Sequence, residues 1–444
     1  MEESLTPSMR IELEWLPPFH GPAEVARTSA AVEIRFGDEN ATQFEDAFSQ
    51  SVQQRARVSA YPLAIWLASS WWRIRWEPLP ARVRLTRNGA PADAGWRMSH
   101  ELPAAGYGFI WPQLVFASDG ESIRVRCHRS TVVSGEPARF LSDFETFIRA
   151  DEFEVATDNF IDLVLRRLDA LGETELHRIW QEVLAERSDP GSASARRLEA
   201  RLGYEPDEIP PELLERFMGL VSEVGPDATD EIAPVCAGSH PMDVFNTVNE
   251  LASLPGLEGR ISFPGLSPGE PGRIPPWERG QRLAHTLRQS LGFPSQPVND
   301  TALADLLHLR PEHLAPNGVP RAPMGLAVRR PGSGALKLLF RKQNRPARRF
   351  EAARFIADSL CAGEADRWLP VTDAATARQK VQRAFAAEFL CPIEALRDYL
   401  GDEFLPEAFE EAAEHFGISE MAIKSHLANH HLIPHSLVES ETIP

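Results

Sequence analysis

Arg354 and Asp358 are charged residues one helical turn apart in a stretch that could support chemistry. The Asp358 carboxylate could bind a hard cation, because such ions prefer oxygen ligands. Arg354 would repel that cation, since a guanidinium stays protonated in proteins. The spacing therefore favours an i,i+4 ion pair on one helix face, worth roughly a few tenths of a kcal/mol. A remodelled polar pocket is the alternative interpretation.

Two helices are needed to position these residues. We predict the first over residues 348–360, because apolar side chains recur there at helical spacing and Pro346 stands ahead of them, where a helix can begin. We predict the second from residue 378, with the same spacing of apolar residues, and Pro392 ends it. The chemistry of the stretch therefore depends on how these two helices pack together.

The helix pair resembles the core of the ImmA/IrrE family of metallopeptidase-like proteins. That family has a helix reading roughly Arg-Arg-Phe-x-x-Ala-His-Glu-x-x-His, and a second helix with a Glu ligand ahead of Phe-Ala-Ala-x-Leu-Leu-x-Pro. Here the second motif is matched by residues 385–392, which read FAAEFLCP. The first motif is matched at Arg348, Arg349, Phe350 and Ala353, but not at its two His and its Glu. The resemblance covers about residues 276–434 and implies a zincin-type α+β domain.

This chain departs from the family at the positions that bind and use zinc. Arg354 and Asp358 stand where the family has its two His ligands, and Phe355 stands where it has the catalytic Glu. Gln379 stands at the place of the third ligand. Zinc hydrolysis needs neutral imidazoles at i and i+4, a further ligand and a base beside the bound water. We therefore expect no zinc, no other cofactor and no catalytic residue.

A tryptophan-rich run at residues 65–78 is the most unusual local sequence, and seven of the ten tryptophans fall in the first 150 residues. Read as a strand, residues 71–77 alternate between two faces. One interpretation is a stacking surface for a base, a nucleotide or a peptide. Its candidate residues are Trp71, Trp72, Arg73, Arg75, Trp76 and His100. We favour the other interpretation, a tryptophan-rich core, because large aromatic side chains dominate cores.

The composition is that of a soluble protein with two or three domains. The chain has 444 residues, of which 43% are hydrophobic and 25% charged. We expect no membrane span, because no apolar run reaches about 18 residues. We expect a cytoplasmic location, because the start of the chain lacks a secretory signal. The four cysteines are widely spaced, which argues against disulfides.

The charge is strongly acidic overall but unevenly distributed. A net charge of -18 argues against general binding of nucleic acid or anionic membranes. Residues 321–350, however, hold nine Lys and Arg and no acidic residue. We expect this basic segment to face the chain's own acidic groups, with an acidic partner or a nucleic acid as alternatives.

Sequence patterns predict an α+β protein in four parts. Residues 1–150 form a tryptophan-rich, mostly-β domain, because alternating apolar and polar residues recur between turn signals. Residues 151–253 form a helical region and residues 254–275 a Pro/Gly-rich linker. The degenerate ImmA/IrrE-like domain follows at 276–444, with a helical tail at 405–434.

The tail is predicted as helix, turn, helix, and it resembles the helix-turn-helix of transcription regulators. Seven acidic residues and no Lys or Arg lie between Gly401 and Ile423, so phosphate contact would be repulsive there. We therefore expect packing against the peptidase-like core rather than DNA readout. His430, His431 and His435 could bind a metal, but a histidine pair near a terminus usually has no role.

Three functional hypotheses follow. The first is a catalytically inactive metallopeptidase-like protein that binds a protein partner, in a bacterial regulatory or defence setting implied by the resemblance. The second is an active metallo-hydrolase with rearranged ligands near Asp358. The third is a DNA-binding transcription regulator that uses the basic segment or the tail. The loss of the zinc positions favours the first.

Overall fold

The computed structural model describes residues 8–81, 83, 85, 93–130, 137–263, 266, 274–315, 322–330, 334–401, 405–434 and 436–439. The chain divides into two compact units, Met1–Leu214 and Glu215–Pro444, and the boundary falls inside helix α8 (Pro211–Val224). The named strands pair antiparallel, and helices are present in both units, so the fold is α+β. The predicted helical region 151–253 is shared between the two units.

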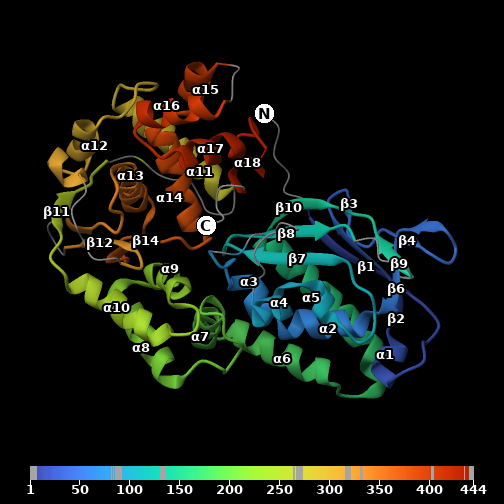
Figure 1. The fold of residues 1–444 in the computed structure, drawn as a ribbon. Coiled ribbons are helices and arrows are strands. Elements are labelled where there is room, and N and C mark those ends of the chain that lie inside the picture. Colours follow the sequence, from blue (N-terminus) through green and yellow to red (C-terminus); the bar gives the residue numbers. More distant parts are fainter. Residues whose placement is uncertain are drawn as a thin grey trace. The chain divides into compact units, whose positions relative to one another are not determined.

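The first unit combines three small sheets with helices (Figure 1). Its strands are β1 (Met9–Trp15), β2 (Ser29–Phe36), β3 (Glu39–Asn40), β4 (Phe44–Asp46), β5 (Ser51–Gln53), β6 (Ala56–Ser59), β7 (Gln113–Ser118), β8 (Ser122–His128), β9 (Ala138–Phe140) and β10 (Phe144–Arg149). Its helices are α1 (Ala23–Arg27), α2 (Ala60–Ser69), α3 (Trp71–Trp76), α4 (Ala94–His100), α5 (Ala150–Leu168), α6 (Glu175–Ser188) and α7 (Pro190–Arg201), with short 3-10 turns η1 (Leu102–Ala105) and η2 (Asp169–Leu171).

One main hydrophobic core joins two of the three sheets to the helices of this unit, and a small second cluster forms around Trp96 of α4. The sheets have strand orders β1-β2-β3, with β6 also on β2, then β10-β8-β7, and β5-β4-β9. Burial alternates along β8, where Ile123, Val125 and Cys127 point into the core, whereas β2 is buried along nearly its whole length. Helix α5 buries Phe153, Phe160 and Val164 in the same core. Strands β1 to β10 all lie within residues 1–150, where the sequence predicted strands.

The tryptophan-rich run is helical, so its prediction as a strand is wrong. Residues 60–69 form α2 and residues 71–76 form α3, with Ser59 capping α2 through its side chain. The alternation of Trp and Arg over six residues fits a strand, but the same residues also contain a helical signal. Arg73 and Glu77 form a buried i,i+4 ion pair at 2.7 Å, which only a helix brings together. A mostly-β description therefore misses α2, α3 and α4.

The second unit wraps helices around one antiparallel sheet with the order β11-β13-β12-β14. Its strands are β11 (Leu257–Arg260), β12 (Gly325–Arg329), β13 (Ala335–Leu339) and β14 (Trp368–Val371). Its helices after α8 are α9 (Pro226–Cys236), α10 (Pro241–Ser253), α11 (Pro276–Ser290), α12 (Asp300–Leu306), α13 (Arg345–Cys361), α14 (Ala377–Leu390), α15 (Ile393–Leu400), α16 (Pro406–Phe416), α17 (Glu420–Asn429) and α18 (Ser436–Glu439), with a 3-10 turn η3 (Pro311–Leu314).

Part of the predicted linker belongs to this sheet. Residues 257–260 form β11, which pairs with β13 from Leu257 opposite Leu338 to Arg260 opposite Ala335. Gly259 in β11 has no room for a side chain, because a Cβ there would lie 2.7 Å from the carbonyl oxygen of Leu307. Half of the remaining Pro/Gly-rich stretch, residues 264, 265 and 267–273, lies outside the described residues.

Helices α11 and α14 pack closely through a glycine, which gives a first prediction. A Cβ at Gly280 would lie 2.4 Å from the carbonyl oxygen of Val381. Gly280→Ala should therefore lower the free energy of unfolding by about 1–3 kcal/mol, as overpacking does. In the matched control Gly219→Ala, on the exposed face of α8, a Cβ meets nothing within 4 Å, so stability should rise by about 0.5–1 kcal/mol. Chemical denaturation measures both, and a stable Gly280→Ala protein would contradict the close approach.

The tail forms the two predicted helices, α16 and α17, which enclose a left-handed Gly417. The side chain of Arg349, on α13, donates from Nε to the carbonyl oxygen of Gly417 at 2.8 Å and also binds Asp300 and the carbonyl oxygen of Val298. Helix α17 buries Ile423 and Leu427 in the core of the unit. The tail is therefore packed against this core.

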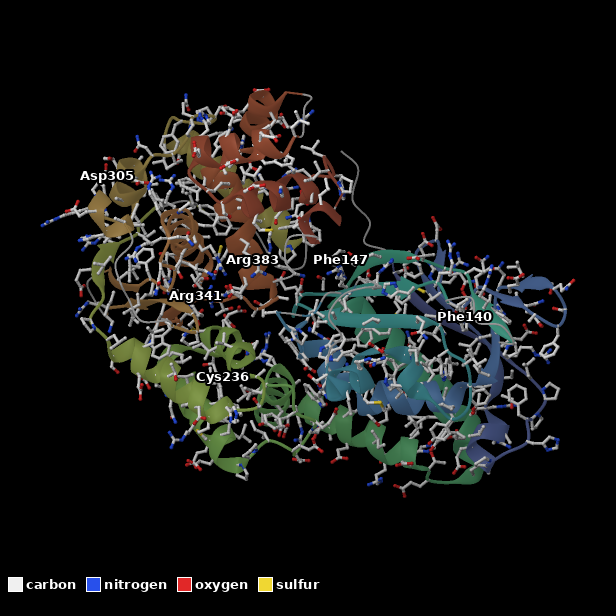
Figure 2. The ribbon with its side chains drawn as sticks, viewed as in Figure 1. Phe140, Phe147, Cys236, Asp305, Arg341 and Arg383 are labelled. Carbon is white, nitrogen blue, oxygen red and sulfur yellow. The ribbon has the colours of Figure 1, made fainter. Side chains whose placement is uncertain are left out.

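The cysteines play no covalent part in the fold. Cys127, Cys236 and Cys391 are buried and Cys361 is half-buried, and all four are free thiols. Burial raises the pKa of Cys236, labelled in Figure 2, to about 12. Within the described ranges, no helix combines the length and the apolar character that crossing a bilayer requires.

Candidate functional site

Helices α13 and α14 carry the residues that the family resemblance singles out. The side chain of Asn344 caps α13 by accepting from the N–H of Ala347 at 2.9 Å, and Thr376 caps α14 by accepting from the N–H of Gln379 at 3.3 Å. Both helices bury most of their surface, because α13 lies against α14 and against strand β14. The polar residues between them are therefore cut off from solvent and must find partners within the protein.

The Arg354 guanidinium is held by two glutamines and a backbone carbonyl. Its Nη2 donates to the carbonyl oxygen of Thr372 at 2.6 Å, to Oε1 of Gln382 at 3.2 Å and to Oε1 of Gln379. The same Gln379 oxygen accepts from the N–H of Thr372 at 2.9 Å. Both glutamine amides donate to the carbonyl oxygen of Pro370, at 3.0 and 3.1 Å. The end of β14 is thus fixed to α13 and α14 by amide groups.

Cationic groups gather around Arg354. Burial first, and then the neighbouring Arg383 and Arg341, lower the pKa of Arg354 to about 9. Figure 2 labels these two neighbours, and Arg383 donates to the carbonyl oxygen of Ala374 at 3.0 Å. Arg341 donates two hydrogen bonds to the Asp373 carboxylate, from Nη1 to Oδ2 and from Nη2 to Oδ1, both at 2.8 Å. A divalent cation placed at Arg354 would face repulsion from all three guanidinium groups.

Asp358 belongs to a separate buried ion-pair network. Its two oxygens accept from Nε and Nη2 of Arg378 at 2.7 and 2.9 Å, which is the bidentate fork that arginine forms with carboxylates. Arg378 also donates from Nη1 to Asp366 at 2.6 Å. Asp358 has no exposed surface. Burial lowers the pKa of Arg378, but the adjacent Asp358 and Asp366 outweigh it and raise that pKa.

The position of the family's catalytic Glu holds part of the apolar core. Phe355 is fully buried, with its ring 5.2 Å from that of Phe340 in an edge-to-face arrangement. One turn earlier lies Glu351, whose Oε2 accepts from the N–H groups of Arg341 and Lys342, both at 3.0 Å. Burial raises the pKa of Glu351. This carboxyl secures the chain between β13 and α13.

The predicted i,i+4 ion pair between Arg354 and Asp358 is wrong. Arg354 turns to the glutamines of α14, whereas Asp358 turns to Arg378. The reason is burial, because both residues lie inside the unit, where each needs several partners that a single surface pair cannot supply. Arg354, Asp358 and Gln379 meet partners across the α13–α14 contact, whereas Phe355 packs against Phe340, which follows β13. The arrangement can orient and neutralise charges, and both oxygens of Asp358 are already engaged by Arg378.

The proposed stacking surface in the first unit is not exposed. Trp71, Trp72 and Arg73 are at most 4% exposed and His100 has no exposed surface. Arg75 and Trp76 are half-buried, with the Arg75 guanidinium 3.8 Å from the centre of the Trp76 ring. The alternative interpretation of these six residues as a stacking surface does not fit this burial. The favoured interpretation, a tryptophan-rich core, agrees with it, because α2 and α3 turn Trp66, Trp71 and Trp72 into the core.

Glu77 organises the polar members of that cluster. Its Oε2 accepts from Nε of Arg73 at 2.7 Å and lies 2.9 Å from Nε2 of His100. The other ring nitrogen of His100 lies 2.9 Å from the carbonyl oxygen of Phe116, and the Trp96 ring stacks on the imidazole at 4.3 Å. The residues predicted to face a ligand thus form a structural network.

The basic segment pairs with acidic groups of the same unit, as expected from the sequence. Arg345 and Arg349 both bind Asp300, and Arg330 binds Glu258. Together with the Arg341–Asp373 pair, these contacts engage much of the positive charge between residues 322 and 350.

Three members of the site were missed from the sequence: Glu351, Arg378 and Gln382. Each stands on a predicted helix, but its spacing from Arg354 or Asp358 along the chain carries no signal. A further group consists of Glu388 on α14 with His426 and His430 at the end of α17. His430 was named from the sequence as a possible metal ligand, but together with His431 and His435. Glu388 and His426 were missed, and the signal for His426 is its i,i+4 spacing from His430.

No family model, curated protein or solved structure matched the chain. The resemblance to the ImmA/IrrE family therefore stays a prediction from the residues quoted above.

Proposed function

We propose that the second unit is a metallopeptidase-like domain without a hydrolytic centre at the α13–α14 contact, and that the protein acts by binding a protein partner. The resemblance places that action in bacterial regulation or defence. The observation that carries the proposal is the bidentate Arg378–Asp358 pair. Asp358 stands where the family has a zinc ligand, and its carboxylate is already paired with the Arg378 guanidinium.

The neighbouring positions support the same reading. Arg354 is fixed by Gln379 and Gln382 and surrounded by other guanidinium groups. Phe355 fills the place where a general base would act on a metal-bound water. A hydrolytic centre needs an open coordination position on the metal and a group that can accept a proton. Arg354, Phe355 and the paired Asp358 offer neither.

An exposed aromatic in the first unit favours a protein partner. Phe48, between β4 and β5, is 88% exposed, and Val52 on β5 is 54% exposed. β5 is an edge strand of its sheet. Exposed aromatics beside a free strand edge suit protein recognition, because such residues are typical anchors of interfaces.

DNA readout by the tail is less well supported. In α17, which would be the recognition helix, Ile423, His426 and Leu427 are buried in the unit. Lys424 is also buried and pairs with Glu420 at 2.6 Å. A recognition helix needs its polar face free for the major groove, so the burial of α17 agrees with a packing role.

The metal content of the protein tests the proposal. We expect Asp358→Asn and Gln379→Leu to leave the zinc content of the full chain unchanged, because neither residue holds the ion. Mass spectrometry of protein purified without chelators measures this, with circular dichroism to confirm that the variants fold. We also expect no hydrolysis of a mixed peptide library by the zinc-supplemented wild type. Zinc lost on Asp358→Asn, or peptide hydrolysis abolished by that variant, would contradict the proposal.

A further inference from the structure

Glu388, His426 and His430 bring three metal-binding side chains together at a place that the α13–α14 chemistry does not use. One possible ligand atom from each lies within 4.8 Å of the other two. The Nε2 atom of His426 and the Oε2 atom of Glu388 are 3.3 Å apart. A tetrahedral zinc ion with bonds of about 2.0–2.2 Å separates its ligand atoms by roughly 3.4 Å, so this pair already has the required spacing.

The histidine at the centre of the group has an unused ligand atom. Nε2 of His426 is buried in a residue that is 3% exposed, and although it lies 3.3 Å from Oε2 of Glu388, it makes no hydrogen bond among the described residues. Buried polar atoms in proteins nearly always have a partner, so such an atom calls for an explanation. A metal ion between His426 and Glu388 supplies one.

Two helix ends point at the group. Glu388 lies in the last turn of α14, which ends at Leu390, and His426 lies in the last turn of α17, which ends at Asn429. His430 follows directly as the C-cap of α17. The C-terminal end of a helix carries partial negative charge, which stabilises a cation. Both helices therefore favour positive charge at this place.

The hydrogen bonds of a neighbouring cation do not occupy the ligand atoms. Arg288 is close enough to interact with the charge of Glu388, but it donates to the carbonyl oxygens of Pro294, Gln296 and Phe389 rather than to Glu388. Glu388 accepts a long hydrogen bond of 3.4 Å from the N–H of Ile393. The amide of Gln281 lies 3.0 Å from Nε2 of His430, and an ion would replace that single neutral contact.

The ligand types select the metal. Mg²⁺ and Ca²⁺ prefer oxygen ligands throughout, whereas two imidazoles and a carboxylate form a common zinc set with one open position. Glu388 lies nine residues beyond Gln379 on α14, or about 13 Å along the helix. The group is thus separate from the positions lost at the α13–α14 contact, and the expectation of no zinc rested on those positions alone.

We propose that Glu388, His426 and His430 bind a zinc ion that ties α17, and with it the tail, to α14. Loss of a residue that only supports a metal ligand typically weakens metal binding by about 10–100-fold. Loss of one of the three ligands themselves should weaken zinc binding more. Glu388→Gln and His430→Ala should therefore each weaken zinc binding by more than about 100-fold. Titration of the chelator-treated full chain with Zn²⁺ against a chromophoric chelator measures the affinity and the stoichiometry, which should be one ion per chain.

Matched variants make the result specific. His431→Ala changes an exposed histidine beside the group, and it should bind zinc as the wild type does. At about 100 times the dissociation constant, zinc should raise the melting temperature of the wild type by roughly 5–10 °C. Mg²⁺ should not do so, and His430→Ala should show no zinc-dependent rise. A wild type without a tight zinc site, or Glu388→Gln and His430→Ala binding zinc normally, would overturn the proposal.

Comparing the zinc content of His430→Ala and Asp358→Asn shows which of the two places holds an ion. Zinc lost on His430→Ala but kept on Asp358→Asn supports both proposals. Zinc lost on Asp358→Asn but kept on His430→Ala contradicts both, and it would point to a metal centre at the α13–α14 contact instead.

Discussion

Replacing Asp358 with alanine should lower the free energy of unfolding by about 3–5 kcal/mol, the usual cost of breaking a buried ion pair by removing one partner. Asp358 is fully buried and gives both oxygens to Arg378. The variant would leave the Arg378 side chain, only 13% exposed, with Asp366 as its remaining carboxylate partner in this network. Denaturant unfolding of the full chain, followed by circular dichroism, measures the loss.

An exposed ion pair of the same unit is the control. Arg282 and Glu278 pair at i,i+4 on α11, with side chains 63% and 36% exposed. Arg282→Ala should cost at most a few tenths of a kcal/mol, or about 0.5 at the upper limit, because solvent replaces the lost contact. If the two variants lost equal stability, the Asp358 network would not be the buried structure described.

Replacing Glu77 with alanine should lower the free energy of unfolding of the first unit by about 3 kcal/mol, at the low end of the range for a buried pair. Glu77 is 7% exposed and binds Arg73 and His100. The low end applies because Arg73 keeps Glu205, at 2.6 Å, as a second carboxylate. Glu205→Ala is the matched control: its side chain is 37% exposed, so its loss should be clearly smaller.

The Glu77 effect should depend on pH. Burial alone would raise the pKa of Glu77, but its contacts with His100 and Arg73 outweigh burial and lower the pKa below 4.5. A carboxyl with a lowered pKa in the folded state stabilises fully above its ordinary pKa and loses this contribution as the pH falls below it. The difference between wild type and Glu77→Ala should therefore shrink in acid. A difference that grew as the pH fell would contradict the assignment.

The helices of the candidate site could be predicted, because their apolar spacing and flanking prolines are local signals. Helices α13 and α14 lie where that spacing placed them. The secondary structure of residues 71–77 was harder to predict, because seven residues are too few to separate the helical period from the strand period. The i,i+4 spacing of Arg73 and Glu77 was the helical signal, but one charged pair is a weak indication.

The partners of the site residues could not be predicted. Asp358 is bound by Arg378, twenty positions further along the chain, and the pairing depends on how α13 packs against α14. The segment between the helices decides that register, and its charged residues, such as Asp366, do not indicate from the sequence which of them will meet Arg378. The same holds for Glu388 and His426, which meet only because α17 folds back onto α14.

The contact between Arg349 and Gly417 limits which residues these two positions can hold. A Cβ at position 417 would lie 2.9 Å from Nε of Arg349, and the glycine itself has φ of +65°. A change in the C-terminal helices that moved this carbonyl would remove one partner of the buried Arg349 and leave it with Asp300 and the carbonyl oxygen of Val298. The tail is thus tied to α13 through this pair, and we expect a substitution at either position to disturb the other.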